Sequence, residues 1–125
     1  MFKNTKAFSG FSVNDLERAK EFYGQALGLE IEEIAAGLML KIAGTNGVFV
    51  YPKEDHAPAT FTILNFLVDD LAVAAEALKK KGVTFEQYPP MTDENGLAFG
   101  RESNMGPDIA WFKDPAGNIL SILRD

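Results

Sequence analysis

The apolar positions of the chain follow two periods, one typical of helices and one typical of strands. Helical spacing occurs in residues 16–27 and 71–78, where apolar side chains recur every three or four positions. Asn14 and Glu17 have the spacing of a capping box before the first segment, and Gly28 suits a left-handed cap after it. The pattern therefore predicts two helices, the first of about three turns.

Short runs rich in β-branched and aromatic residues surround both predicted helices. One run precedes each helix, at residues 6–13 and 61–68. The runs that follow the helices lie at residues 29–36, 38–43 and 48–52, and then at 83–88, 97–103, 108–113 and 118–123. Gly47 and Gly117 stand in turns between the last two runs of each half, where they can supply a positive φ.

The two halves of the chain repeat one pattern. Phe11 matches Phe66 and Asp15 matches Asp70, and each pair is 55 positions apart. Residues 52–60 carry two prolines and a charge cluster, which predicts a linker. We therefore predict one domain, residues 1–125, composed of two tandem modules at residues 1–55 and 59–125.

Composition and charge limit the classes of partner. The 125 residues carry 12 basic and 18 acidic side chains, so the net charge of −6 disfavours nucleic acid. No apolar run approaches the ~20 residues that a membrane helix requires. The chain has no cysteine, and its first residues lack the apolar segment of a signal peptide, so a cytoplasmic location is expected.

Two motifs and the repeat together resemble a known superfamily. The segments "AKEFYGQALGLE" at residues 19–30 and "FKDPAGNILSIL" at residues 112–123 are similar to those of the vicinal oxygen chelate superfamily, which includes glyoxalase I, bleomycin-resistance proteins and extradiol dioxygenases. The resemblance implies an α+β fold of two tandem βαβββ modules. In that fold the mixed sheets form cups with the helices outside, and the ligand or metal lies inside.

The resemblance also implies four positions at which a metal ligand would stand. The metal-dependent members carry His or Gln at the start of each first strand and Glu on each last strand. Counting from the helix-opening aspartates gives Phe8 and Ile63, and counting from the turn glycines gives Tyr51 and Ser121. None of these is an imidazole or carboxylate, so we predict no metal and no other cofactor. The single histidine, His56, falls in the linker and is predicted to be a solvated loop residue.

Alternate strand positions predict a cup lined by apolar and aromatic side chains with a few polar groups. Asn65 is a candidate because a buried amide needs a hydrogen-bond partner or a ligand. Arg101 is a candidate because its guanidinium could bind a carboxylate bidentately. The predicted ligand-binding residues are Phe8, Ser12, Phe49, Tyr51, Ile63, Asn65, Arg101, Trp111 and Ser121.

Three functional hypotheses follow from this lining. The first is a metal-free small-molecule-binding protein of the bleomycin-resistance type, whose apolar or aromatic ligand could be cationic, given the net charge of −6. The second is a lyase, isomerase or dioxygenase of the same superfamily, with a non-standard or missing metal site. The third is a collapsed cup in an assembly module. The cup could close within one chain or across two, and a homodimer is predicted.

Overall fold

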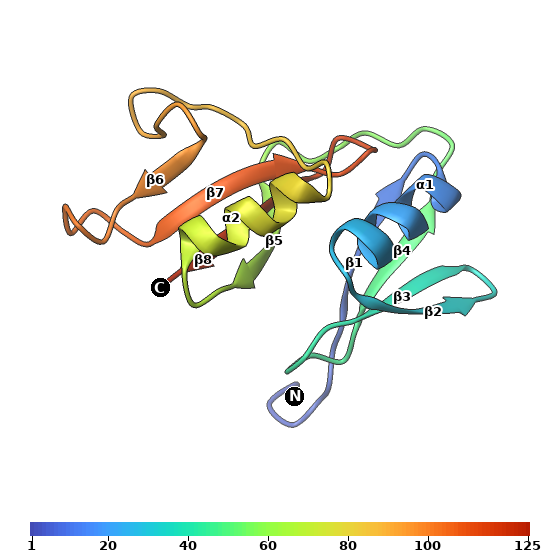
Figure 1. Cartoon of the computed structure of the whole chain (residues 1–125). Helices are drawn as coiled ribbons and strands as arrows, with labels where there is room; N and C mark the ends of the chain where they lie inside the picture. The colour runs from blue at the N-terminus through green and yellow to red at the C-terminus, as the bar shows by residue number, and fades with distance from the viewer. The chain divides into compact units, whose positions relative to one another are not determined.

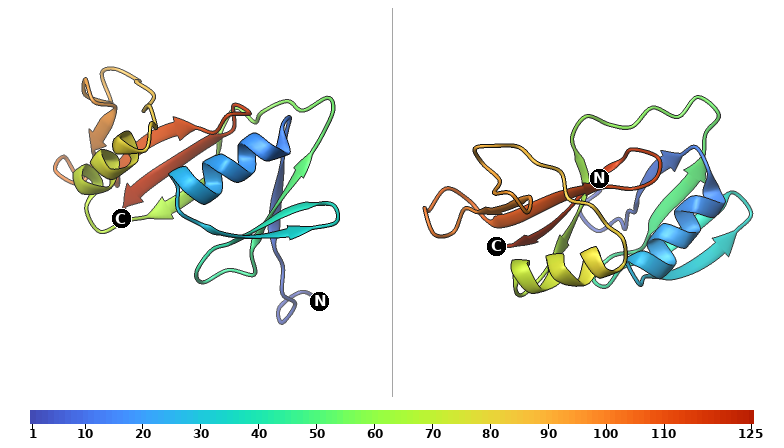
Figure 2. Two further views of the ribbon diagram at one scale, coloured as in Figure 1. Left: turned by 45° about the vertical axis from the view of Figure 1, so that its right-hand side comes forward. Right: turned by 45° about the horizontal axis from the view of Figure 1, so that its top comes forward.

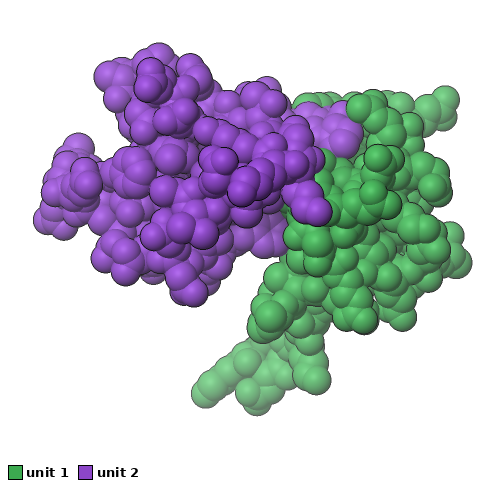
Figure 3. All heavy atoms as spheres, in the orientation of Figure 1, with its two compact units in different colours: residues 1–58 green, residues 59–125 purple.

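The computed structural model describes residues 1–125, which form two compact units, residues 1–58 and residues 59–125 (Figure 3). Each unit is a four-stranded mixed sheet with helix packed on one face (Figures 1 and 2). No helix in the structure is both long enough and apolar enough to cross a lipid bilayer.

The first unit has the order strand, helix and three strands. Its elements are β1 (Ser9–Val13), α1 (Leu16–Glu21), a π-helical segment η1 (Phe22–Ala26), β2 (Glu30–Ile34), β3 (Gly37–Lys41) and β4 (Val48–Pro52). The sheet order is β1-β4-β3-β2, in which β1 is parallel to β4 and the other pairs are antiparallel. The first strand therefore lies beside the last.

The second unit repeats this topology. Its elements are β5 (Thr62–Leu67), α2 (Leu71–Lys80), β6 (Leu97–Phe99), β7 (Asp108–Lys113) and β8 (Ile119–Arg124). The sheet order is β5-β8-β7-β6, again with the first strand parallel to the last. The predicted α+β fold of two βαβββ modules is thus confirmed.

Each core lies between the helix and one face of its sheet. In the first unit, α1 packs on β3 and β4, and the ring of Phe11 lies 5.8 Å from that of buried Tyr23. In the second unit, α2 packs on β7 and β8. The buried apolar strand residues are Val13, Leu38, Leu40, Val48, Val50, Leu97, Ala98, Ala110, Phe112, Leu120 and Ile122.

Both helices begin at an aspartate that caps the first turn. The Asp15 carboxylate accepts a hydrogen bond from the Arg18 amide at 3.1 Å, and Asp70 accepts one from Val73 at the same distance. The capping box expected at Asn14 is therefore wrong by one residue. Asp15 is the residue with extended backbone angles, which an N-cap requires, and Gly28 follows the helix with the expected positive φ of 71°.

Two of the predicted strand runs are shorter than expected. Residues 83–88 form no strand and pair with the sheet at an isolated bridge between Phe85 and Phe112, whose rings meet edge to face at 5.8 Å. The run at 97–103 ends as a strand at Phe99, because the chain turns at Gly100, whose carbonyl accepts a hydrogen bond from the Met105 amide. The apolar residues of both runs therefore pack against neighbouring side chains, and only a few of them take part in strand pairing.

The turn at residues 114–118 fixes how β7 pairs with β8. The Asp114 carboxylate accepts hydrogen bonds from the amides of Ala116 and Asn118, both at 2.9 Å, and from the Asn118 side chain at 3.0 Å. Asp114 is buried, and Gly117 has a φ of 85°. The turn sets the register in which Trp111 lies opposite Ser121.

Replacement of the first helix cap tests the capping assignment. Asp15→Ala should lower the free energy of unfolding by about 0.5–2 kcal/mol, because the Arg18 amide in the first turn loses its acceptor. Denaturant unfolding measures this change. Asn14→Ala is the matched control and should change the free energy by less than about 0.5 kcal/mol. A larger effect at Asn14 than at Asp15 would contradict the observed cap.

Asp114→Ala should destabilise the second unit by about 1–3 kcal/mol, because buried amides of the turn lose their acceptor. The same denaturant titration serves here, with the exposed Asp69→Ala as a charge-matched control. Equal stability of the two variants would show that the carboxylate does not hold the turn.

Candidate functional site

Each sheet has one face covered by its helix and a second face without a helix, which we call the helix-free face. Side chains alternate between the two faces along a strand, so the cross-strand pairs identify which residues share a face. In the first unit, Phe11 and Val50 pair on the helix side. In the second unit, Leu120 and Phe112 pair on the helix side. Their sequence neighbours therefore form the helix-free faces.

The helix-free face of the first unit is aromatic. Ser12 lies opposite Tyr51, and Gly10 lies opposite Phe49. The rings of Phe49 and Tyr51 are stacked, with centroids 5.4 Å apart and planes at 22°. Phe8 precedes β1 and is 61% exposed. Of the predicted ligand-binding residues, Ser12, Phe49 and Tyr51 are thus brought together on one surface.

His56 joins this surface. Its Nδ1 lies 2.6 Å from the Ser12 hydroxyl oxygen, and the imidazole is half-buried. The prediction of a solvated loop histidine is therefore wrong. No local sequence signal could have revealed this contact, because it joins residues 44 positions apart.

The segment before His56 is tied to the same unit. The Lys53 amide donates to the Val13 carbonyl at 2.9 Å, which extends the pairing of β1 and β4 by one bond. The Lys53 ammonium lies 2.5 Å from the Asp55 carboxylate. That hydrogen bond and the attraction between the charges lower the pKa of Asp55 and raise the pKa of Lys53. Both groups are exposed, so solvent screens the pair, and its main effect is local ordering.

The helix-free face of the second unit carries a row of three residues on neighbouring strands. Asn65 on β5 lies opposite Ser121 on β8, and Ser121 lies opposite Trp111 on β7. Ser121 is completely buried, and its hydroxyl donates to the Asn65 carbonyl oxygen at 2.5 Å. The structure therefore brings together three of the predicted ligand-binding residues of this half, Asn65, Trp111 and Ser121.

Two further residues complete this surface, and the sequence analysis missed both. The indole Nε1 of Trp111 donates to the Thr62 hydroxyl oxygen at 3.2 Å. The ring of Tyr88 meets the Trp111 ring edge to face, at 5.5 Å and 82°. Thr62 reaches this face because the register of β5 shifts between Thr62 and Leu64. Ile63, a predicted ligand-binding residue, lies in that irregularity and has no cross-strand partner.

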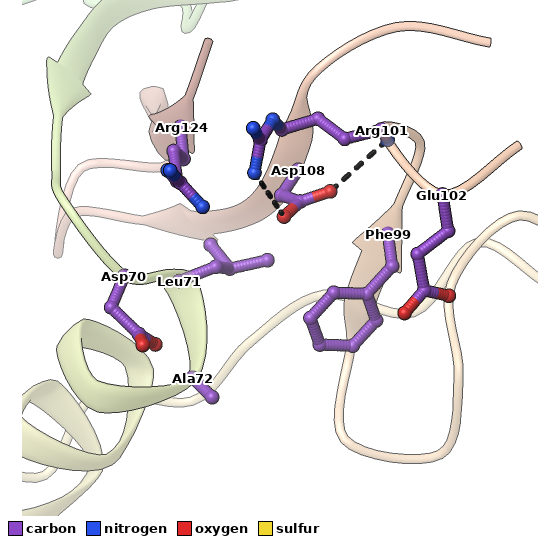
Figure 4. Close-up of a pocket in the computed structure, with 8 residues that line it drawn as sticks. All are labelled: Asp70, Leu71, Ala72, Phe99, Arg101, Glu102, Asp108 and Arg124. Atoms are coloured by element: carbon purple, nitrogen blue, oxygen red, sulfur yellow. Dashed lines mark hydrogen bonds and ion pairs between the residues drawn. The ribbon is translucent and has the colours of Figure 1, made fainter. Parts of the chain in front are cut away.

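Arg101 lies apart from these residues. It lines a cavity of about 500 Å³ at the start of α2, together with Phe99, Asp108 and Arg124 (Figure 4). Its guanidinium is directed toward Asp108, at 4.0 Å from a carboxylate oxygen, and its amide donates to the other carboxylate oxygen at 3.1 Å. Asp108 is on the helix side of β7, since it alternates with Ile109 and Trp111. Arg101 is therefore not part of the surface that carries Trp111.

The residues at the family's metal positions do not fit a metal. Strand pairing revises one assignment: Gly10 and Asn65 are equivalent in the repeat and lie opposite Phe49 and Ser121, so Phe49, and not Tyr51, is the counterpart of Ser121. This revision supplies neither an imidazole nor a carboxylate. No group of three or more His, Asp or Glu side chains in residues 1–125 could hold a metal ion.

Known structures share this fold. A glyoxalase family protein from Enterococcus faecalis is 20% identical with a TM-score of 0.71, covering 99% of this chain and 100% of that one. A superfamily member from Sphaerobacter thermophilus is 21% identical with a TM-score of 0.69, covering 100% of both chains. TnmS3, an antibiotic binding protein from Streptomyces sp. CB03234, is 21% identical with a TM-score of 0.68, covering 99% of this chain and 98% of that one.

No curated protein matches the chain. The model of one family does match, over residues 8–122, which include both helices, both sheets and the two helix-free faces. The repeated βαβββ topology agrees with that match. The chain belongs to the Glyoxalase/Bleomycin resistance protein/Dioxygenase superfamily.

Proposed function

We propose that this chain is a metal-free small-molecule-binding protein whose ligand is apolar or aromatic. The observation that carries the proposal is the composition of the helix-free faces. Stacked Phe49 and Tyr51 on one and Trp111 on the other offer flat apolar surfaces, and Ser12, Asn65 and Thr62 add a few polar groups. Apolar and aromatic walls with few polar groups are typical of small-molecule sites.

Two arguments support binding over metal-dependent catalysis. The positions at which the superfamily's metal-dependent members bind a metal hold Phe8, Phe49, Ile63 and Ser121, and none of these can replace an imidazole or a carboxylate. TnmS3, which shares the fold over nearly its whole length, is described as an antibiotic binding protein. Sequestration of a ligand needs only shape, stacking and hydrogen bonds, and the aromatic rings and hydrogen-bonding side chains of these faces support that role.

A metal-free enzyme of the same superfamily is the second candidate. The hydrogen bond between Ser12 and His56 favours it, because a hydroxyl or water held by an imidazole is where general-base catalysis begins. Recovery of a bound ligand chemically unchanged after long incubation would favour the binding protein. Conversion of that ligand, abolished by His56→Gln, would favour the enzyme.

Divalent metals should leave the melting temperature of the purified protein unchanged. A metal that binds only the folded state stabilises it by RT ln(1 + [L]/Kd), where [L] is the concentration of free metal. In a protein without metal-binding side chains this stabilisation is absent. Thermal melts with zinc, nickel, manganese and ferrous ions, each repeated with EDTA, measure the effect. A rise in melting temperature that EDTA reverses would overturn the metal-free proposal.

An aromatic ligand found by thermal screening should raise the melting temperature, and Trp111→Ala and Tyr51→Ala should reduce that rise. The quantity to compare is the shift that the ligand produces within each variant, because truncation of a half-buried ring also lowers the basal stability. Phe99→Ala is the matched control, since Phe99 pairs with Asp108 and thus belongs to the helix side of its sheet. If the control lost the ligand-induced shift to the same extent as both variants, this result would argue against ligand binding on the helix-free faces.

A further inference from the structure

We propose that the helix-free face of the second unit selects an aromatic ligand that carries a hydrogen-bond acceptor, such as a ketone or amide oxygen, in preference to a cation. This inference rests on the proposed function and specifies its ligand class. It follows from which donors and acceptors on this face are already used within the chain.

The burial of Ser121 determines the orientation of the Asn65 amide. Ser121 is completely buried, and its hydroxyl hydrogen has one acceptor, the Asn65 carbonyl oxygen at 2.5 Å. If the amide were turned over, Ser121 would accept and its own hydrogen would be buried without a partner, which is costly. The burial of Ser121 therefore turns the amide nitrogen of Asn65 away from β8.

Asn65 and Thr62 each have a hydrogen-bond donor that no group of the chain accepts. Asn65 is exposed, and its amide nitrogen has no partner within the chain. The Thr62 hydroxyl oxygen accepts from Trp111, so its hydrogen points elsewhere, and it too has no acceptor within the chain. Asn65 and Thr62 stand on β5, and the Trp111 ring belongs to the same face. The polar groups of this face that remain available to a ligand are thus hydrogen-bond donors, and they lie on the same face as an aromatic ring.

The helix-free face of the second unit offers no charged group that would favour a cationic ligand. The one ammonium on this face, that of Lys113, is paired with Glu86 at 3.4 Å. No unpaired carboxylate from β5, β7 or β8 stands on the face, so a cation would find no anionic partner there. The chain's net charge of −6 favours a cation only at a distance, and salt screens exposed charges beyond ~8 Å. Contact with donors therefore decides the preference.

The surrounding side chains make the face suitable for a flat ligand. Leu67 is 77% exposed, and Ile109, Ile119 and Leu123 are half-buried on the same face. Tyr88 packs against the Trp111 ring with the two planes at 82°, which restricts the rotation of the indole. A carbonyl at the rim of such a ligand would reach the donors of Asn65 and Thr62.

Three probes of one shape test the preference. They are 2-acetylnaphthalene, which carries an acceptor, 2-isopropylnaphthalene, which carries none, and 1-(2-naphthyl)ethylammonium, which carries a positive charge. Trp111 is the single tryptophan of the chain, so its fluorescence reports directly on this face. We expect the acetyl compound to bind roughly three- to tenfold more tightly than the other two, as one net hydrogen bond implies.

Asn65→Asp should reverse this order. The new carboxylate still accepts from Ser121 but offers no donor, so the acetyl compound should lose its advantage and the ammonium compound should become the tightest ligand. Asn95→Asp is the matched control, because it adds the same charge at an exposed loop position of the same unit and should leave the order unchanged.

The outcomes separate the two proposals. Tighter binding of the acetyl compound, with reversal in Asn65→Asp alone, supports the inference. Equal binding of all three probes, or a preference for the ammonium compound in the natural chain, overturns the acceptor preference and leaves ligand binding intact. No fluorescence change and no thermal shift with any probe overturns ligand binding on this face, and the acceptor preference with it.

Discussion

The structure depends on the parallel pairing of the first and last strands within each unit. β1 pairs with β4 and β5 with β8, so residues about half a unit or more apart in sequence become direct neighbours. A parallel pair cannot be joined by a tight turn, and the intervening chain must cross the sheet. Here the crossing includes a helix, which covers one face of the sheet and leaves the other without a helix. The helix-free faces are therefore a consequence of the pairing.

The same pairing places Ser121 between Asn65 and Trp111, where it is completely buried. A buried hydroxyl must be hydrogen-bonded, and the cross-strand amide is the partner that the register supplies. The hydrogen bonds of the Asp114 turn keep β7 and β8 in this register. The turn at residues 114–118 thus has a structural role, because it fixes the position of the strand that carries Ser121.

Periodicity and repetition were enough to predict the helices, most strands and the two modules, because these follow from local spacing. The contacts of the site were harder to foresee. Thr62 reaches Trp111 only through a register shift in β5, and His56 reaches Ser12 only because the chain after β4 folds back. The sequence predicts Arg101 as a ligand-binding residue, whereas the turn at Gly100 directs it to Asp108. Each difference arises from long-range pairing, which a single sequence does not encode in local patterns.

The repeat has kept its topology and changed its chemistry. Gly10 and Asn65 are equivalent positions, and their partners across the strands are Phe49 and Ser121. A glycine opposite an aromatic ring leaves a flat surface suited to stacking, whereas an amide opposite a buried hydroxyl presents donors. Gly10 leaves little room for a side chain, because an added Cβ would lie 3.1 Å from the Phe49 carbonyl oxygen. The first face is therefore an aromatic surface, whereas the second carries the hydrogen-bonding side chains of Asn65 and Thr62.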